Sequence, residues 1–416
     1  MAPYEEGQTS VTASAVLKRG EGRSFKAGGL WIYDNEIDHL EKEPADGEIV
    51  ELLDHDGYFL GYGFYNSHSR IRIRILSRDR KRPVSDELLL ERVRAAWEYR
   101  KHVMRSPEDL TACRLIFGES DLLPGLTVDR FGEVLVVESL ALGIDRFKEK
   151  ILAFLADVLK KDGESIRGVY ERSDSKERDL EGLPRVSGWL EVPGTQQGGE
   201  TNVPIVENGI RYLVDIANGQ KTGFFLDQKY NRLAIRSLCK GARVLDCFTH
   251  TGAFALNAAV GGAESVLAVD ASETAVAQAT ENAKQNGLEQ AVSFQTADIF
   301  DLLPELERRK EKFDVVILDP PAFTKSRASV KKAAAGYREI NLRGMRLVRE
   351  GGYLATCTCS HFMEEELFAR TIAEAARSAH RRLRQVEFRQ QAPDHPILWT
   401  GDANSYYLKF YIFQVL

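Results

Sequence analysis

The stretch VLDCFTHTGAF, residues 244–254, decides the fold class. A short apolar strand runs directly into a turn of small residues, and a helical pattern follows. Such a turn lets a ligand approach the backbone closely. Gly252 is its one glycine, whereas a pyrophosphate cradle for NAD or FAD uses several. The turn therefore favours a smaller adenosyl ligand without phosphate groups, although an ordinary strand–helix turn stays open as an alternative.

Further strands follow this turn, and helical patterns lie between them. The apolar segments are 265–270, 292–298, 313–319 and 352–360. Strands that alternate with helices predict βαβ units and hence a doubly wound, mostly parallel sheet. The tail, 406–416, is a long β-rich run, and we expect it to close the sheet in a hairpin with 386–390. The predicted fold class is α/β.

Acidic residues end three consecutive strands of the predicted sheet: Asp246, Asp270 and Asp298. The carboxyl ends of parallel strands meet along one crevice, where such folds bind ligands. We expect Asp270 to accept hydrogen bonds from the hydroxyls of a ribose. We expect Asp298 to accept one from the amino group of an adenine. A single aspartate at a strand end is more often a helix cap or a turn former, so that interpretation stays open for each one.

The next two strands end in residues suited to catalysis. One ends in Asp319-Pro320-Pro321, where two prolines stiffen the loop and hold the carboxylate in a fixed geometry. The other ends in Cys359-Ser360, and we expect Ser360 to cap a helix that lowers the pKa of the Cys359 thiol. Cys357 is predicted to be a small buried side chain. The spacing of these cysteines favours no metal site.

The rest of the chain predicts two more domains. Residues 1–82 consist of short strands and Gly-rich turns, and they end in RIRIRIL (70–76), whose alternation puts three arginines on one strand face. We expect a small β-barrel there. Residues 83–200 mix helical and strand-like segments and predict a central α+β domain, with 187–204 as a connector. Residues 201–416 then form the α/β domain.

Composition limits the function classes. The chain has 416 residues, five cysteines and a net charge of −6, with no signal peptide or apolar run that could cross a membrane. We therefore expect a cytoplasmic protein without a membrane partner. The negative net charge argues against a nucleic-acid partner. The clustering of basic residues in two segments argues for one. Residues 70–82 hold seven basic residues and one acid, and 325–349 hold eight and one.

These motifs, in this order, resemble a known family. LDCFTHTGAFAL, SVLAVDAS, ADIF, LDPPAF and TCS resemble class I S-adenosylmethionine (SAM)-dependent methyltransferases with a seven-stranded sheet. KTGFFLDQ (221–228) resembles the extra cofactor-side motif of large-subunit rRNA methyltransferases, and the first block resembles their PUA-type RNA-binding barrel. The chain is most similar to the PUA-containing family that makes 5-methylcytosine in bacterial 23S rRNA.

The resemblance implies SAM as cofactor, S-adenosylhomocysteine (SAH) as product, and a role for each matching residue. Cys359 matches the nucleophile that adds to C6 of cytosine, and Asp319 the acid that binds the base and borders the cofactor. The cofactor-binding positions are Phe225, Asp227, Gln228, Asp246, Phe248, Thr251, Gly252, Asp270, Asp298 and Asp319. The second half of the reaction needs a general base that the sequence does not identify.

The implied partner is large-subunit ribosomal RNA, and the barrel's strand edges leave a homodimer open. The residues expected at the RNA are Arg70, Arg72, Arg74, Pro320, Pro321, Phe323, Lys325, Arg327 and Tyr337. One departure matters, because many RNA cytosine-5 methyltransferases have a second cysteine where this chain has Pro321. A guanine N7 or N2 methyltransferase and a non-catalytic RNA-binding assembly factor therefore stay open. The missing glycine fingerprint disfavours an NAD-dependent oxidoreductase.

Overall fold

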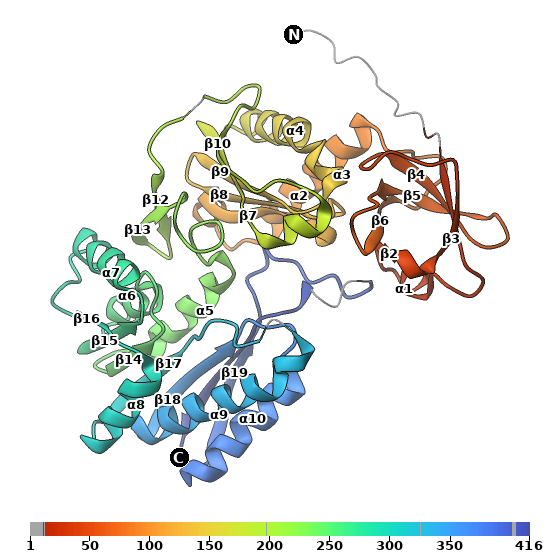
Figure 1. Cartoon of the computed structure of the whole chain (residues 1–416). Coiled ribbons are helices and arrows are strands. Elements are labelled where there is room, and N and C mark those ends of the chain that lie inside the picture. Colours follow the sequence, from red (N-terminus) through yellow and green to blue (C-terminus); the bar gives the residue numbers. More distant parts are fainter. Residues whose placement is uncertain (1–10, 12, 197, 325, 402–404) are drawn as a thin grey trace. The chain divides into compact units, whose positions relative to one another are not determined.

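A computed structural model describes residues 11, 13–196, 198–324, 326–401 and 405–416 (Figure 1). The chain divides into two compact units, neither of which is continuous in sequence. The first unit comprises Met1–Ile205, Val214–Leu226 and Pro393–Ser405, and the second comprises Val206–Leu213, Asp227–Ala392 and Tyr406–Leu416. The domain limits at residues 82 and 200 stay a prediction.

The first unit begins with a curled six-stranded sheet of strand order β2-β6-β5-β4-β1-β3. The isoleucines of β6 lie on the inner face of the strand, as the alternating sequence predicts, because Ile73 and Ile75 are buried in the core of this sheet. The prediction that this part consists of short strands is therefore confirmed. Its elements are β1 (Ser14–Leu17), α1 (Arg23–Lys26), β2 (Trp31–Tyr33), β3 (Ile37–Glu41), β4 (Ile49–Leu53), β5 (Phe59–Tyr65) and β6 (Ile71–Ser77).

The first unit continues with a five-stranded sheet of order β11-β10-β9-β8-β7 and the helices α2, α3 and α4. The predicted helix from residue 86 is α2, whose N-cap Ser85 accepts a hydrogen bond from the Leu88 amide. The sequence missed β8, because Asp129 and Arg130 in it are buried polar residues. These elements are α2 (Asp86–Val103), β7 (Ala112–Phe117), β8 (Leu126–Phe131), β9 (Val134–Ser139), α3 (Leu142–Asp145), α4 (Lys148–Lys161), β10 (Gly168–Ser173) and β11 (Val186–Leu190).

The predicted connector 187–204 is partly wrong, because it contains most of β11 and the start of β12. A strand can form in this stretch because Trp189 packs edge-on against Tyr170 of β10 and so gives the polar sequence an apolar anchor. The two strands that follow, β12 (Asn202–Glu207) and β13 (Ile210–Asp215), form a separate two-stranded sheet.

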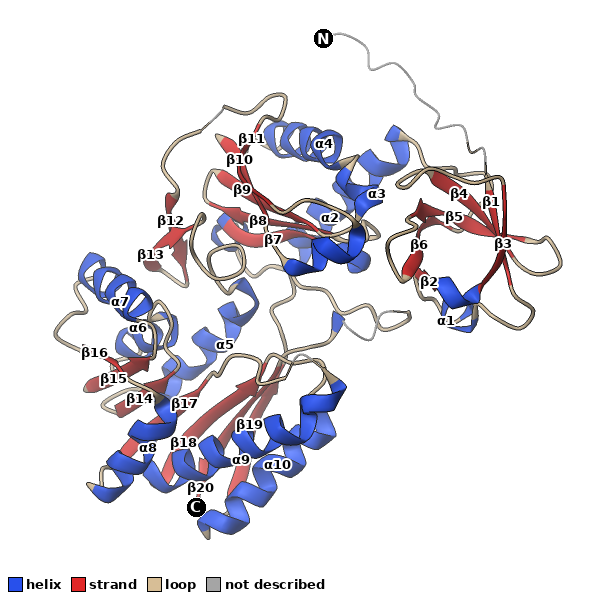
Figure 2. Cartoon of the chain, viewed as in Figure 1, coloured by secondary structure: helices blue, strands red, loops and turns tan. Residues whose placement is uncertain are grey.

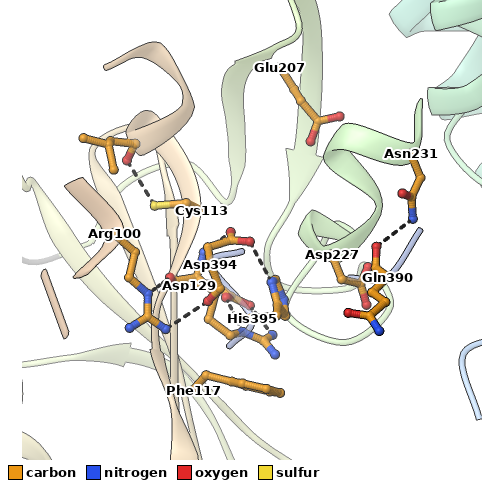
Figure 3. A network of polar contacts seen from close by, with 12 residues as sticks. Arg100, Cys113, Phe117, Asp129, Glu207, Asp227, Asn231, Gln390, Asp394 and His395 are labelled. Atoms are coloured by element: carbon orange, nitrogen blue, oxygen red, sulfur yellow. Dashed lines mark hydrogen bonds and ion pairs between the residues drawn. The ribbon is translucent and has the colours of Figure 1, made fainter. Parts of the chain in front are cut away.

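A buried ionic network holds two distant segments in the first unit (Figure 3). Arg100 of α2 is fully buried and binds Asp121 through both terminal nitrogens, at 2.5 and 2.8 Å. It also donates to the backbone carbonyl of Asp394 at 2.9 Å, and the Asp394 carboxylate accepts from the Arg114 amide at 2.9 Å. Arg114 in turn binds Asp129 in a bidentate pair. The chain at Asp394 is thereby fixed to the central sheet.

The second unit contains a seven-stranded sheet of order β16-β15-β14-β17-β18-β20-β19. The strands from β16 to β18 in this order are parallel, and β20 runs antiparallel to both of its neighbours. The predicted α/β fold with a closing hairpin is therefore confirmed. The strands are β14 (Arg243–Cys247), β15 (Ser265–Asp270), β16 (Val292–Thr296), β17 (Phe313–Leu318), β18 (Val348–Thr358), β19 (Leu383–Arg389) and β20 (Lys409–Val415).

Six α-helices among the described residues of the second unit accompany this sheet (Figure 2). The last three pack together, and they share an apolar core with alternate strand residues such as Leu245, Cys247 and Val316. The helices are α5 (Lys229–Ala234), α6 (Ala253–Val260), α7 (Glu273–Gln285), α8 (Ile299–Arg308), α9 (Val330–Leu347) and α10 (Glu365–Ala379). Among the described residues, none of the helices is long and apolar enough to cross a membrane.

Candidate active site

The turn after β14 is held in an unusual backbone conformation. Phe248, His250 and Gly252 have φ angles of 65°, 50° and 85°. Backbone bonds fix the turn to β15, because the Thr249 amide donates to the Val269 carbonyl and the His250 amide to the Asp270 carboxylate, at 2.9 and 2.8 Å. Strained turns that the surrounding structure holds in place are typical of ligand sites.

Asp246 is the penultimate residue of β14, just before this turn, and is completely buried. Thr249 Oγ1 donates to its Oδ2 at 2.5 Å, whereas its Oδ1 has no hydrogen-bond partner among the described residues. Burial, together with the charges of Asp319 and Asp270, raises the pKa of the Asp246 carboxyl to about 8, and the hydrogen bond from Thr249 opposes that shift. A buried carboxyl of this kind is suited to receive a cationic group from a ligand.

The two other predicted strand-end acids lie in different surroundings. Asp270 is half-buried at the end of β15, and its two oxygens accept from the amides of His250 and Ser272 at 2.8 and 2.9 Å. It can also accept the hydroxyls of a ribose, because each carboxylate oxygen has a second lone pair. Asp298 is exposed and caps α8 by accepting from the Phe300 amide. For Asp298, the structure therefore agrees with the alternative that the sequence left open, in which the aspartate caps a helix.

Asp319, at the end of β17, is the centre of a hydrogen-bonded group. Its Oδ1 accepts from Gln228 Nε2 at 2.9 Å and from the Cys357 thiol at 2.8 Å. Burial raises the pKa of the Asp319 carboxyl to about 6, and the bond from Cys357 opposes that shift. Cys357 is buried as predicted, but the sequence did not indicate that its thiol would bind Asp319. Burial raises the pKa of that thiol, which keeps it a neutral donor.

The residues that follow KTGFF hold Gln228 in place. Asn231 Nδ2 donates to Gln228 Oε1 at 2.6 Å and to the Gln390 carbonyl at 3.2 Å (Figure 3). Tyr407 donates its hydroxyl to Asp227 Oδ2 at 2.7 Å. Both Asp227 and Gln228 are buried. These contacts join α5 to the β19–β20 end of the sheet, a link that the sequence could not indicate.

Cys359 comes directly after β18, and it is partly exposed. Its neighbours are fixed on both sides, because Thr358 Oγ1 donates to the Tyr337 hydroxyl at 2.8 Å and Ser360 Oγ to the Thr324 carbonyl at 2.9 Å. The prediction that Ser360 caps a helix is wrong: α10 begins at Glu365 with Glu364 as its N-cap. Ser360 is buried, and its hydroxyl holds the loop after Asp319 instead.

Aromatic rings line the loop after Asp319. Phe323 is partly exposed, and its ring centroid lies 4.6 Å from that of Tyr337 and 5.9 Å from that of Phe300. Tyr337 is fully buried, so it supports Phe323 and the strand end from inside the core and cannot itself stack on a base. Pro320 is buried and Pro321 exposed.

The basic residues expected at RNA divide into exposed and internally bound groups. Arg70 and Arg327 are exposed, whereas Lys325 lies outside the described residues. Arg72 donates to the Asn66 carbonyl at 3.0 Å. Arg74 is nearly buried and forms an ion pair with Glu181 at 2.6 Å, so its charge is already compensated. Counting arginines in the sequence therefore overstates the free positive charge.

Two further observations concern the expected ligands. Phe225, one of the expected cofactor-binding residues, lies in the first unit, where the Lys221 ammonium is 4.8 Å from its ring centroid. Within the part of the chain that the structure describes, no group of three or more His, Cys, Asp or Glu side chains is arranged to hold a metal ion.

Comparison with known proteins identifies the family. The S-adenosylmethionine-dependent methyltransferase family matches residues 194–403, and the PUA-like domain family matches residues 15–78. The ribosomal RNA large subunit methyltransferase I of Aeromonas salmonicida is 39% identical over 397 residues, 94% of this chain and 97% of that protein. The chain belongs to the ribosomal RNA large subunit methyltransferase I family. It is a SAM-dependent methyltransferase with a PUA-like domain.

Other members and structures agree with this assignment. The family member from Photobacterium profundum is 39% identical over 401 residues, 96% of this chain and 98% of its own length. A proposed SAM-dependent methyltransferase from Streptococcus mutans superposes with a TM-score of 0.79 at 22% identity, covering 96% of this chain and 99% of that structure. This likeness extends the shared fold over nearly the whole chain.

The residues around the turn fit SAM. The Oδ1 atom of Asp246 and Oγ1 of Thr251 are buried without a hydrogen-bond partner among the described residues, and an amino-acid end would supply donors and acceptors to both. Asp270 has the acceptor capacity that a ribose needs. At Gly252, a Cβ atom would lie 3.1 Å from Ala279 Cβ and 3.3 Å from the Phe294 ring, so a side chain would disturb the turn. When bound, SAM supplies an electrophilic methyl group.

Proposed function

We propose that this enzyme methylates C5 of a cytosine in large-subunit ribosomal RNA, with Cys359 as the nucleophile. The relatives named above are large-subunit rRNA methyltransferases, which supports the RNA class. The observation that carries the proposal is the placement of Cys359 and Asp319. They follow the neighbouring strands β18 and β17, and Cys359 is partly exposed. A thiol and a carboxyl at adjoining strand ends can approach the same base.

The chemistry of cytosine explains why a thiol is needed. C5 is a poor nucleophile, and a thiolate that adds to C6 makes C5 enamine-like. The Cys359 Sγ–C6 bond forms as the C5=C6 double bond opens. C5 uses that electron pair to take the methyl group, whose bond to the donor sulfur would break and leave its electrons on that sulfur. A base then removes the proton from C5, and the Sγ–C6 electrons return to sulfur when that bond breaks. The same thiolate is regenerated, so Pro321 in place of a second cysteine is consistent with release by this elimination.

Asp319 is proposed to hold the N3/N4 edge of the base. Its Oδ1 is occupied by Gln228 and Cys357, which fixes the carboxyl plane. Because burial raises its pKa to about 6, the carboxyl can carry a proton near neutral pH and donate it toward N3. Protonation at N3 withdraws electrons from C6, and this favours thiolate addition. Gln228 and Cys357 therefore act as positioning residues for Asp319.

The RNA is proposed to bind through exposed basic and aromatic residues. Arg327 and Pro321 are exposed and Phe323 is half-buried in the loop after Asp319, so that Phe323 can stack on a base taken out of its helix. In the PUA-like sheet, Arg70 and Arg72 are proposed to contact phosphates. Tyr337 and Arg74 are left out of this RNA surface, because both are engaged in the interior.

Trapping on 5-fluorocytosine RNA tests the proposal. Fluorine at C5 blocks elimination, so the enzyme should form an SDS-stable complex whose cross-linked peptide contains Cys359. Cys359→Ala should give no complex and no methylation, while it still binds SAH. Cys239→Ala is the matched control, because Cys239 is buried, donates to the Ile235 carbonyl and lies outside the segments that follow β17 and β18. Full methylation by Cys359→Ala would refute the mechanism.

The same experiment separates the alternatives. A guanine methyltransferase would methylate RNA without a trapped complex, and the methylated base would be a guanine. A non-catalytic assembly factor would bind RNA but transfer no tritiated methyl group to undermethylated large-subunit RNA. Either result would replace the cytosine mechanism.

A further inference from the structure

Lys409, the first residue of β20, is a buried lysine beside the proposed nucleophile. Its side chain is 1% exposed, and its Nζ donates to the Ser360 carbonyl at 3.2 Å and to the Tyr407 carbonyl at 3.3 Å. Lys409 is also the cross-strand partner of Thr358. The ammonium therefore lies beside Ser360, the residue after Cys359, and the backbone of Lys409 pairs with Thr358, the residue before it.

The charge around Lys409 is not balanced by a carboxylate. The ammonium lies 4.8 Å from the Tyr406 ring centroid, and among the described residues it forms no ion pair within 4.0 Å. Glu365 is the carboxylate that raises the pKa of Lys409 most, and it accepts a hydrogen bond from the Tyr406 hydroxyl at 2.7 Å. Burial lowers the pKa of Lys409 to about 8, and Glu365 and Cys359 oppose that shift. The titratable groups that bear on the pair are Glu364, Glu365, His361, Tyr406, Tyr337 and Cys357.

In the part of the chain that the structure describes, no helix N-terminus lies at Cys359 to stabilise its thiolate. Because α10 begins at Glu365, its N-terminus is several residues beyond the cysteine, and its first turn contains Glu365 and Glu366. These acids disfavour a thiolate rather than stabilise it. A cation close to Cys359 would offset these acids and favour ionisation of the thiol near neutral pH.

We propose that Lys409 is a positioning residue that stabilises the thiolate form of Cys359. The inference rests on the proposed role of Cys359 as nucleophile. When Lys409 is neutral, its Nζ takes the proton as the S–H bond breaks, and an ammonium–thiolate pair results without a change in net charge. When Lys409 is already protonated, the thiol proton goes to solvent and the ammonium stabilises the remaining charge. After elimination from C6, the thiolate returns to the same partner.

Three substitutions separate charge from packing. Lys409→Gln keeps donors for the two carbonyls but removes the charge, Lys409→Arg keeps the charge, and Lys409→Met removes both. The measurement is the pH dependence of Cys359 alkylation by iodoacetamide, followed on the Cys359 peptide by mass spectrometry. An opposite charge within about 4–6 Å shifts a pKa by about 1–3 units. Lys409→Gln should therefore slow alkylation at pH 7 at least ~10-fold and restore it at high pH.

The charge-keeping variant provides the rescue. Lys409→Arg should retain most of the reactivity, and Lys409→Met should resemble Lys409→Gln. Methylation should follow the same order through kcat rather than KM, because Lys409 does not contact RNA in this proposal. If the alkylation profile of Lys409→Gln coincides with that of the native enzyme, Lys409 has only a packing role and the inference is refuted.

The native enzyme gives a second test, in case a variant does not fold. Folding of each variant is checked by SAH binding. In the native chain, Cys359 should titrate below the value of about 8.5 that is usual for a free cysteine. A normal or raised value would refute the inference without any substitution. Alkylation does not require turnover, so this outcome is independent of the Cys359→Ala methylation test that decides the proposed function.

Discussion

Replacing Asp246 by asparagine should stabilise the ligand-free enzyme and abolish its response to SAH. The folded-state pKa of Asp246 is raised from 3.8 to about 8, so between these values the folded state binds a proton that the unfolded state releases. The free energy of unfolding therefore falls as pH rises through this window. Integrating this linkage gives a penalty of roughly 4 kcal/mol at pH 7. The Asp246→Asn variant would be free of this penalty, because an asparagine side chain does not titrate.

The asparagine introduces a smaller cost of its own. Its buried amide leaves an N–H donor without an acceptor, which costs about 1–3 kcal/mol, so the net gain at pH 7 is about 1–3 kcal/mol. The dependence on pH gives a sharper signal. The difference between Asp246→Asn and the native enzyme should grow by roughly 3–4 kcal/mol between pH 4 and pH 7.

Hydrogen exchange of β14 and α6 peptides across a urea series measures this difference, because it reports stability locally in the second unit. SAH should protect these peptides in the native enzyme, increasingly as pH rises toward about 8, since binding a cation at Asp246 expels the proton. Asp298→Asn is the matched control, because Asp298 is exposed and asparagine caps a helix equally well. Equal pH dependence in Asp246→Asn and the native enzyme would refute the reasoning.

Three other substitutions test other parts of the molecule. Gly252→Ala should destabilise the second unit by about 1–3 kcal/mol and weaken SAH binding measured by calorimetry, because φ is +85° and the added Cβ meets Ala279 and Phe294; unchanged affinity would contradict this. Arg100→Met should cost about 3–5 kcal/mol by thermal and urea unfolding, since it leaves a carboxylate of the buried pair alone, and a neutral effect would show that the pair is dispensable. Arg327→Ala should weaken RNA binding and lower the slope of log affinity against log salt by about 0.7–0.9 in filter binding, whereas the same change at the internally paired Arg74 should leave the slope unchanged.

The sequence predicts the sheet well because strand periodicity and strand-end residues are local signals. Asp246, Asp270 and Asp319 lie at the carboxyl ends of neighbouring parallel strands, and this follows from alternation of strand and helix alone. The contact of Cys357 with Asp319 was not predictable in the same way. It depends on the pairing of β17 with β18 in one register, and residue spacing does not give a register.

Charge and capping were the least predictable features. Arg74 alternates like an exposed residue, but a glutamate more than a hundred positions away makes it internal. Ser360 has the composition of a helix cap, yet a carbonyl from the previous loop competes for its hydroxyl. Lys409 is one basic residue in a β-rich tail, and only the fold brings it beside Cys359. In each case a partner distant in sequence overrides the local preference.

The buried network around Arg100 has a consequence for synthesis of the chain. Arg100 and its carbonyl acceptor at Asp394 are 294 positions apart. At about 5–20 residues per second, a ribosome needs roughly 15–60 s to cover that interval. Until then, the nascent central sheet lacks Asp394 and holds a guanidinium that is missing one of its acceptors. The first unit, although it begins at the N-terminus, can therefore reach its final structure only when nearly the whole protein has emerged.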